Sequence, residues 1–308
     1  METSFSAAVK EQLGRAGLSN PADLLAEAYG MLLFASSFGA DGIRHVTEQP
    51  SLLRRLPVVY ERVFSVIPEI RTPHSGGKTV VSVTKPADIR VICNAFGLDV
   101  HRLSPLRVNR AVLEEESTRA AFLRGAFLAG GSVASPDRRY HLELVTPHYT
   151  LSRELVALLQ EMDLEPKVTV RRANYVLYYK YSEKIENFLT LIGASASALQ
   201  VMSVKVEKDV RNRVNRQVNC DSANITKSVA AAAAQCEAIE RLSASGELKK
   251  LPPVLQETAK ARLENPELAL TALAATFDPP VSRATLDYRL KRLVLLSKPE
   301  DRSKKDRT

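Results

Sequence analysis

Two aspartates at matching positions of a repeated pattern are the first candidates for chemistry. Asp41 and Asp137 lie 96 residues apart, and each follows a helix-like segment that ends in small residues. Carboxylate oxygens are ligands that Mg²⁺ prefers, so this pair could hold a divalent cation. Both also lie in stretches typical of turns, FGADG and ASPDRR, where aspartate is favoured because its side chain bonds to the local backbone. The residues alone leave two interpretations, a metal pair or two ordinary turns.

The other titratable residues form no recognisable catalytic set. The five histidines show no metal-ligand spacing: His45, His74, His101, His141 and His148. The sequence contains no P-loop, G-x-S-x-G or H-E-x-x-H motif. We therefore predict no catalytic residue, no metal site and no cofactor.

A second kind of chemistry, binding to DNA, is indicated near the C-terminus by the segment SRATLDYRLKRLVLL. Ser282 is placed to cap a helix whose buried face is Leu286, Leu290 and Leu293. The opposite face is basic. Two shorter helices before it, the second ending at Asp278-Pro279-Pro280, complete a helix-turn-helix at about residues 267–296.

In this helix-turn-helix the last helix would enter the major groove. We expect Ser282, Arg283, Thr285 and Tyr288 near its start, with the last three reading bases. Arg289, Lys291 and Arg292 would bind phosphate. The alternative is a plain helical bundle with a solvated charged face, and two prolines where many such turns have glycine leave the crossing angle open.

The first two-thirds of the chain repeat one pattern of elements. Helix-like segments at 23–36 and 117–130 are followed by matching strand and helix segments at an offset of 95 to 99 residues, which indicates an internal duplication. We predict the order α-β-α-β-β-α in each half. The expected domain covers residues 22–205, with halves 22–110 and 111–205, after an N-terminal segment 1–21.

Small residues recur on one face of the two leading helices. Gly125 and Ala129 lie four residues apart in the second helix, and Gly30 is at the corresponding place in the first. Small side chains let helix backbones approach closely, so we expect the helices to pack across a pseudo-two-fold axis. The alternative is two buried helices in separate cores.

The last third of the chain lacks the repeated pattern and is predicted to be mainly helical. We expect a linker at 206–224 with a polar hinge at 219–224, and then a helical domain at 225–298. Its first helix has an apolar stripe, Ile225, Val229, Ala232, Cys236 and Ile239. A second helix begins at Pro253, and Asn265-Pro266 is expected to cap a third at 267–277. Residues 299–308 are predicted to be a disordered tail.

Charge and composition agree with a soluble protein that binds nucleic acid. The chain has 308 residues and a formal net charge of +8. Residues 205–308 hold 20 of its Lys and Arg but 14 of its Asp and Glu, so most of the excess is there. Three scattered cysteines, no signal peptide and no apolar run long enough for a membrane predict a cytoplasmic protein.

The paired helices resemble the LAGLIDADG motif of homing endonucleases. Residues 123–131 (LRGAFLAGG) and 28–36 (AYGMLLFAS) overlay the nonapeptide. The copy at 28–36 keeps mainly the glycine of the motif. In those nucleases an acidic eighth residue of each motif holds the metal at the cleavage centre. The eighth positions are Ala35 and Gly130, which cannot bind metal. The resemblance therefore implies an α+β fold with a duplicated LAGLIDADG-like domain that has lost its chemistry.

The whole chain resembles the WhiA family of sporulation and cell-division regulators. The resemblance is strongest at NRQVNCDSANITKSV (215–229), LPPVLQETAKARLENPE and FDPPVSRATLDYRLKRL. It implies a nucleoid-associated, DNA-binding transcription regulator linked to division, chromosome segregation or sporulation, with double-stranded DNA and another regulator as partners and with no membrane or small-molecule substrate.

Two other functions remain open from the sequence. The first is a divergent metal-dependent endonuclease that uses Asp41 and Asp137. The second is a protein-interaction scaffold in which only the C-terminal module binds DNA.

Overall fold

The computed structural model describes residues 4–73, 77–100 and 105–298, so the predicted tail lies outside the described residues. The chain divides into two compact units, which we call the N-terminal unit (Met1–Asp209) and the C-terminal unit (Val210–Thr308). Among the helices of the described residues, none combines the length and the hydropathy that a membrane span requires.

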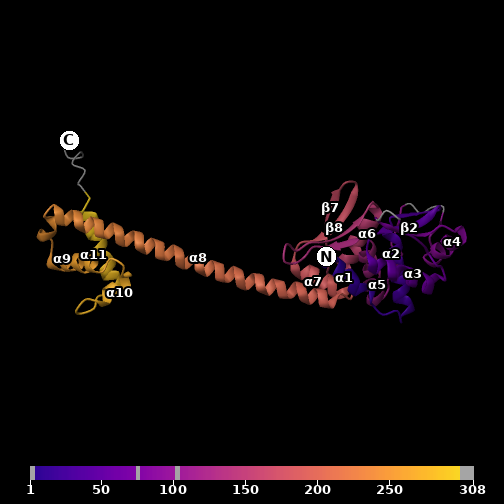
Figure 1. Ribbon diagram of the computed structural model, residues 1–308, viewed down its shortest axis with the longest axis horizontal. Helices are drawn as coiled ribbons and strands as arrows, with labels where there is room; N and C mark the ends of the chain where they lie inside the picture. The colour runs from indigo at the N-terminus through magenta and orange to yellow at the C-terminus, as the bar shows by residue number, and fades with distance from the viewer. Residues whose placement is uncertain (1–3, 74–76, 101–104, 299–308) are drawn as a thin grey trace. The chain divides into compact units, whose positions relative to one another are not determined.

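The N-terminal unit contains the same series of elements twice (Figure 1). The first series is α2 (Pro21–Leu33), β1 (Ser37–Gly39), β2 (Gly42–Thr47), α3 (Pro50–Phe64), β3 (Glu69–Arg71), β4 (Thr79–Val83) and α4 (Pro86–Ala95). The second is α5 (Glu116–Gly130), β5 (Gly131–Val133), β6 (Leu142–Thr146), α6 (Tyr149–Glu161), β7 (Lys167–Arg171), β8 (Asn174–Tyr179) and α7 (Ser182–Leu191). A 3-10 turn, η1 (Arg110–Val112), lies between them.

The two sheets have identical topology. Both are antiparallel and four-stranded, with the orders β1-β2-β4-β3 and β5-β6-β8-β7. The order in each half is thus α-β-β-α-β-β-α, and the predicted order α-β-α-β-β-α was wrong by one strand. The missed strands β1 and β5 have three residues each, too few to show an alternating pattern.

One hydrophobic core serves both halves. Buried residues from Val9 to Val201 form a single cluster, which excludes the alternative of separate cores. The short helix α1 (Phe5–Gly14) lies in the segment that was expected only as an N-terminal extension. Val9 and Leu13 are fully buried in the shared core, and the Ser4 side chain caps α1 by accepting a hydrogen bond from Ala7 N.

Residues 206–224, expected to be a linker with a hinge, are helical. They belong to α8 (Ser195–Ala244), which extends across the boundary between the two units. The polar run at 219–224 suggested a hinge because asparagine and serine have low helix propensity. However, α8 contains neither glycine nor proline, so nothing in it forces a break.

The C-terminal unit closes around a small separate core. Its other helices are η2 (Glu247–Lys250), α9 (Pro253–Glu264), α10 (Leu270–Ala275) and α11 (Arg283–Leu296). Ile239 and Leu242 at the end of α8 join leucines of α9, α10 and α11 in this core.

The start of α10 differs from the expectation. Asn265 is the C-cap of α9 rather than an N-cap, and α10 begins only at Leu270. The buried Arg262 guanidinium donates to the carbonyl of Leu268 at 2.8 Å and to that of Asn265 at 3.4 Å. These carbonyls are occupied by a side chain, so residues 265–269 stay a loop.

Candidate nucleic-acid interface

The motif helices α2 and α5 cross at two glycines. A Cβ atom at Gly30 would lie 2.1 Å from the Phe122 carbonyl oxygen, and one at Gly125 would lie 2.1 Å from the Glu27 carbonyl oxygen. No side chain fits at either place, because both obstacles are backbone atoms. Ala129, expected in the same contact, is partly buried against the common core. The crossing therefore depends on glycine rather than on small residues in general.

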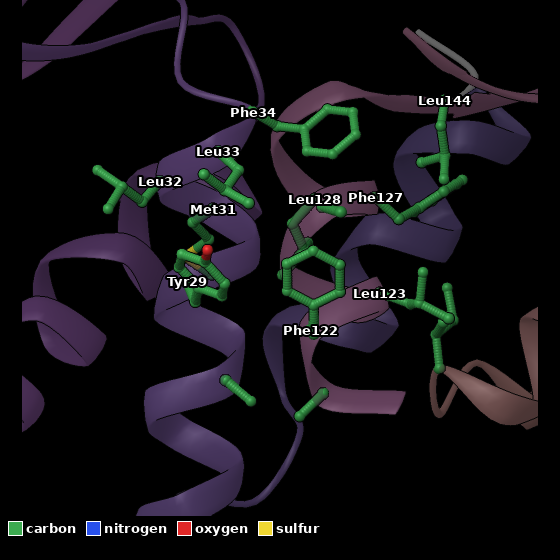
Figure 2. Packing of buried hydrophobic residues seen from close by; sticks show 14 of the residues in the cluster. Tyr29, Met31, Leu32, Leu33, Phe34, Phe122, Leu123, Phe127, Leu128 and Leu144 are labelled. Atoms are coloured by element: carbon green, nitrogen blue, oxygen red, sulfur yellow. The ribbon is translucent and has the colours of Figure 1, made fainter. Parts of the chain in front are cut away.

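Apolar groups fill the ends of these helices, where the nuclease motif has its acids. Ala35 follows the α2 C-cap Phe34, and Gly130 is the last residue of α5. A Cβ atom at Gly130 would lie 2.4 Å from Cδ1 of Phe34, so the ring occupies the space of that side chain. Figure 2 shows Phe34 at the end of its helix, near Phe127 and Leu128 of α5. The eighth positions hold no oxygen ligand.

A buried ammonium group lies close to the same helix end. Lys10 of α1 donates to the Leu128 carbonyl oxygen at 3.1 Å, and its Nζ is 5.8 Å from the centre of the Phe127 ring. Burial lowers the pKa of Lys10 to about 8. The partial negative charge at the C-terminus of a helix offsets only part of the cost of burying this cation. No sequence pattern pointed to this contact, since Lys10 resembles any lysine of an amphipathic helix.

A charge network crosses the motif helices and was also missed. The Glu27 carboxylate of α2 is fully buried and accepts from Arg124 Nε of α5 at 2.9 Å. It also accepts from Arg55 Nη2 of α3 at 2.8 Å and forms a second bond with Arg55 Nε. Such a group is stable when buried because every charge has a partner. A glutamate among apolar residues of a helix was the available signal.

The structure places both candidate metal aspartates in turns. Asp41 lies in the turn between β1 and β2, and Asp137 accepts a hydrogen bond from Ser135 Oγ at 3.1 Å. Across the described residues, no group of three or more His, Cys, Asp or Glu side chains could hold a metal ion. His74 and His101 lie outside those residues. Both aspartates therefore lie in turns, as the second interpretation of the sequence expected.

The three histidines that the structure describes, His45, His141 and His148, do not form a common site. His45 is buried with Nε2 3.3 Å from Tyr60 Oη, and burial lowers its pKa to about 4, so it stays neutral at neutral pH. His141 Nε2 lies 3.1 Å from Glu143 Oε2, and partial burial lowers the pKa of His148. None of these contacts resembles a catalytic arrangement.

Helix α11 has the geometry expected of a recognition helix. Ser282 is its N-cap and accepts from Thr285 N at 3.1 Å. Leu286, Leu290 and Leu293 are fully buried against α9 and α10. The other residues of this helix are exposed or partly exposed.

The residues expected to contact DNA differ in their solvent exposure and in the side-chain contacts they already make. Arg283, Thr285 and Tyr288 are exposed at the start of the helix, with Tyr288 63% exposed. Arg289 is half-buried, and Lys291 forms an ion pair with Asp287 at 2.7 Å. Arg292 Nη1 donates to Tyr288 Oη at 3.3 Å.

Ala284 was not predicted but lies on this exposed face, opposite the buried leucines. Its methyl group could contact a thymine methyl group in the major groove. Nothing in the residue type pointed to it, because alanine is common on any helix.

The fold defines a class of protein through three features: the paired motif helices, the two matching sheets and the helical C-terminal unit. It has a LAGLIDADG-like α/β domain with two sheets, followed by a helical helix-turn-helix domain. The profile of the WhiA LAGLIDADG-like domain matches residues 119–211, and that of the WhiA C-terminal HTH domain matches residues 214–296.

Comparison of whole chains gives the same result. The chain is 35% identical over 302 residues to the "Probable cell division protein WhiA" of Moorella thermoacetica, covering 97% of this chain and 93% of that protein. It is 31% identical over 309 residues to the protein of that name from Thermoanaerobacter sp., covering 96% and 97%. The chain belongs to the WhiA family.

A solved structure shares the fold. Full-length WhiA from Thermotoga maritima superposes with a TM-score of 0.60 at 23% identity, covering 96% of this chain and 98% of that one. The separate N-terminal LAGLIDADG domain of WhiA matches 63% of this chain with a TM-score of 0.50 at 20% identity.

Proposed function

We propose that this protein is a sequence-specific, DNA-binding transcription regulator that acts in cell division, chromosome segregation or sporulation. The observation that carries the proposal is the exposed basic face of α11, held on a buried leucine stripe in a helix-turn-helix domain. The names of its relatives, probable cell division proteins, support the cellular role. Association with the nucleoid would follow from DNA binding.

Base reading is proposed for the start of α11 and phosphate binding for its later turns. Arg283, Ala284 and Tyr288 are exposed where a recognition helix first meets bases. Arg292, two turns further on, is exposed and suits a backbone contact.

The test needs the operator, which genome-wide immunoprecipitation of bound DNA would supply. Binding of the full chain to that duplex is then measured for the parent, Arg283→Ala and Tyr288→Ala. A lost base contact is worth about 1–3 kcal/mol, so each variant should bind the operator roughly 5- to 150-fold more weakly. Binding to random duplex should change far less. Equal loss on both duplexes would show that α11 does not read sequence.

We further propose that the protein does not cut DNA. Support comes from Phe34, whose ring fills the space beside Gly130, and from the absence of an acid at either eighth position. Supercoiled plasmid incubated with the purified protein and Mg²⁺ or Mn²⁺ should stay intact. Metal-dependent nicking that disappears in the double variant Asp41→Asn/Asp137→Asn would instead establish a divergent nuclease.

A further inference from the structure

One stretch of α8 inside the C-terminal unit has no buried face. Every residue from 211 to 231 is exposed, whereas Ile239 and Leu242 further along the helix are buried in the core of the C-terminal unit. Helices in proteins gain most of their stability by packing an apolar face. This stretch gains nothing in that way, so its surface chemistry points to a ligand outside the unit.

The stretch has two faces of different character. At about 100° per residue, Val210, Val214, Val218 and Ile225 share one side of the helix. The opposite side carries three amides and a guanidinium, from Asn212, Asn215, Asn219 and Arg216. Arg211 and Arg213 lie at the two edges of this polar side, separated by roughly 200° around the axis. We call these six residues the asparagine–arginine face.

The asparagine–arginine face is positively charged without internal compensation. Within residues 210–230 there are four basic side chains and one acidic side chain, Asp221. Asp221 lies on the valine side and accepts two hydrogen bonds from Gln217 Nε2, at 3.1 and 3.2 Å. Within the part of the chain that the structure describes, Arg211, Arg213 and Arg216 have no ion pair or hydrogen bond from their side chains. Elsewhere in this unit Lys250 and Lys291 each pair with an acid at 2.7 Å.

These groups match the chemistry of a DNA major groove. Asparagine amides pair with adenine edges and arginine with guanine or phosphate. An α-helix about 10–12 Å wide fits a B-form groove about 12 Å wide. Guanidinium groups on both edges of the face could each reach one of the two phosphate strands that flank the groove. A protein partner with one acidic surface would explain only one edge, and the major groove of A-form RNA is too narrow.

We propose that the asparagine–arginine face of α8 is a second site for double-stranded DNA, distinct from α11. The six residues lie within 211–219, about 12 Å of helix, which matches the length of roughly four base pairs. The inference rests on the proposed DNA-binding function but assigns part of the affinity to a helix outside the helix-turn-helix motif at about 267–296.

Two charge-matched variants of the full chain test this site. The double variant Arg213→Gln/Arg216→Gln removes two unpaired charges from the face. The control Arg241→Gln/Lys260→Gln removes two charges of the same unit that pair with Glu237 and Glu264, at 3.4 and 3.8 Å. Glutamine has nearly the same helix propensity as arginine, so α8 should persist, and circular dichroism checks this.

The probe is a fluorescein-labelled 30-base-pair duplex of random sequence, titrated over a range of salt concentrations. Each lost phosphate contact lowers the slope of log K against log salt by about 0.9. The face variant should therefore lose about 1.8 from the slope and bind about 10-fold or more weakly at low salt. The control variant should bind like the parent.

The outcomes separate this inference from the proposed function. If the face variant matches the control while Arg283→Ala weakens operator binding, the second site is wrong and the proposed function stands. If the parent binds no duplex at moderate salt, both fail. If a 30-base-pair RNA duplex binds as tightly as DNA and depends on the same two arginines, the face binds polyanions generally and the major-groove assignment is wrong.

Discussion

Replacing Gly30 by alanine tests whether the close crossing of α2 and α5 organises the N-terminal unit. The added Cβ atom would lie 2.1 Å from the Phe122 carbonyl oxygen and 2.8 Å from Ala126 N. Ordinary contacts of a Cβ atom begin near 3.4 Å. The obstacles are backbone atoms of α5, so the helices must separate by about 1 Å, and the shared core must open with them.

The magnitude follows from two opposing effects. Overpacking a well-filled core costs up to about 3 kcal/mol when the backbone must move. Alanine regains about 1 kcal/mol because it favours the helix more than glycine does. The free energy of unfolding should therefore fall by about 2 kcal/mol, which lowers the melting temperature of a unit of this size by about 4–8 °C.

Tyrosine signals can report on this unit within the full chain. Eight of the nine tyrosines lie in the N-terminal unit, the exception being Tyr288. Urea unfolding followed by near-ultraviolet circular dichroism thus measures mainly the affected unit. The matched control is Gly39→Ala, because a Cβ atom at Gly39 meets nothing within 4 Å. If Gly30→Ala unfolds within about 0.5 kcal/mol of the control, the reasoning about the crossing is wrong.

Three further substitutions test other parts of the structure. Lys10→Met should stabilise the protein at pH 7, because the native pKa of about 8 lies below the unfolded value of 10.5 and burying the charged form costs about 3 kcal/mol. Between these two pKa values the unfolded state binds more protons, so the stability of the parent rises with pH. The stability advantage of the variant should therefore shrink by about 2 kcal/mol between pH 7 and 9.5, as measured by urea titrations. A constant difference in stability would contradict the shifted pKa. Glu27→Gln should cost about 3–5 kcal/mol by removing the charge that pairs with the buried Arg55 and the partly buried Arg124. Glu183→Gln, at an exposed pair with Lys205, should cost less than about 1 kcal/mol in the same assay. Ser282→Ala should destabilise α11 by about 1 kcal/mol and speed hydrogen exchange at the Thr285 amide, and unchanged exchange would argue against the cap.

Local patterns made the duplication and the recognition helix predictable. The helices α2 and α5 and the longer strands begin within about two residues of their expected positions, because periodic burial is written into the spacing of apolar residues. The Ser282 cap and the leucine stripe of α11 were likewise local signals. Three features were not predictable from such patterns: the missed strands, the late start of α10 and the unbroken α8. Each depends on contacts with another part of the chain or on the absence of a helix-breaking residue, and not on a periodic pattern.

The sequence by itself determined that the chain repeats one unit, ends in a helix-turn-helix and lacks an acid at both eighth motif positions. Only the tertiary structure decided what replaces those acids and what joins the halves. The Phe34 ring beside Gly130, the Lys10 ammonium on the Leu128 carbonyl and the two arginines on Glu27 come from different elements. Contacts between residues so far apart in the chain follow from how the helices pack, and a linear pattern of residue types carries no record of that packing.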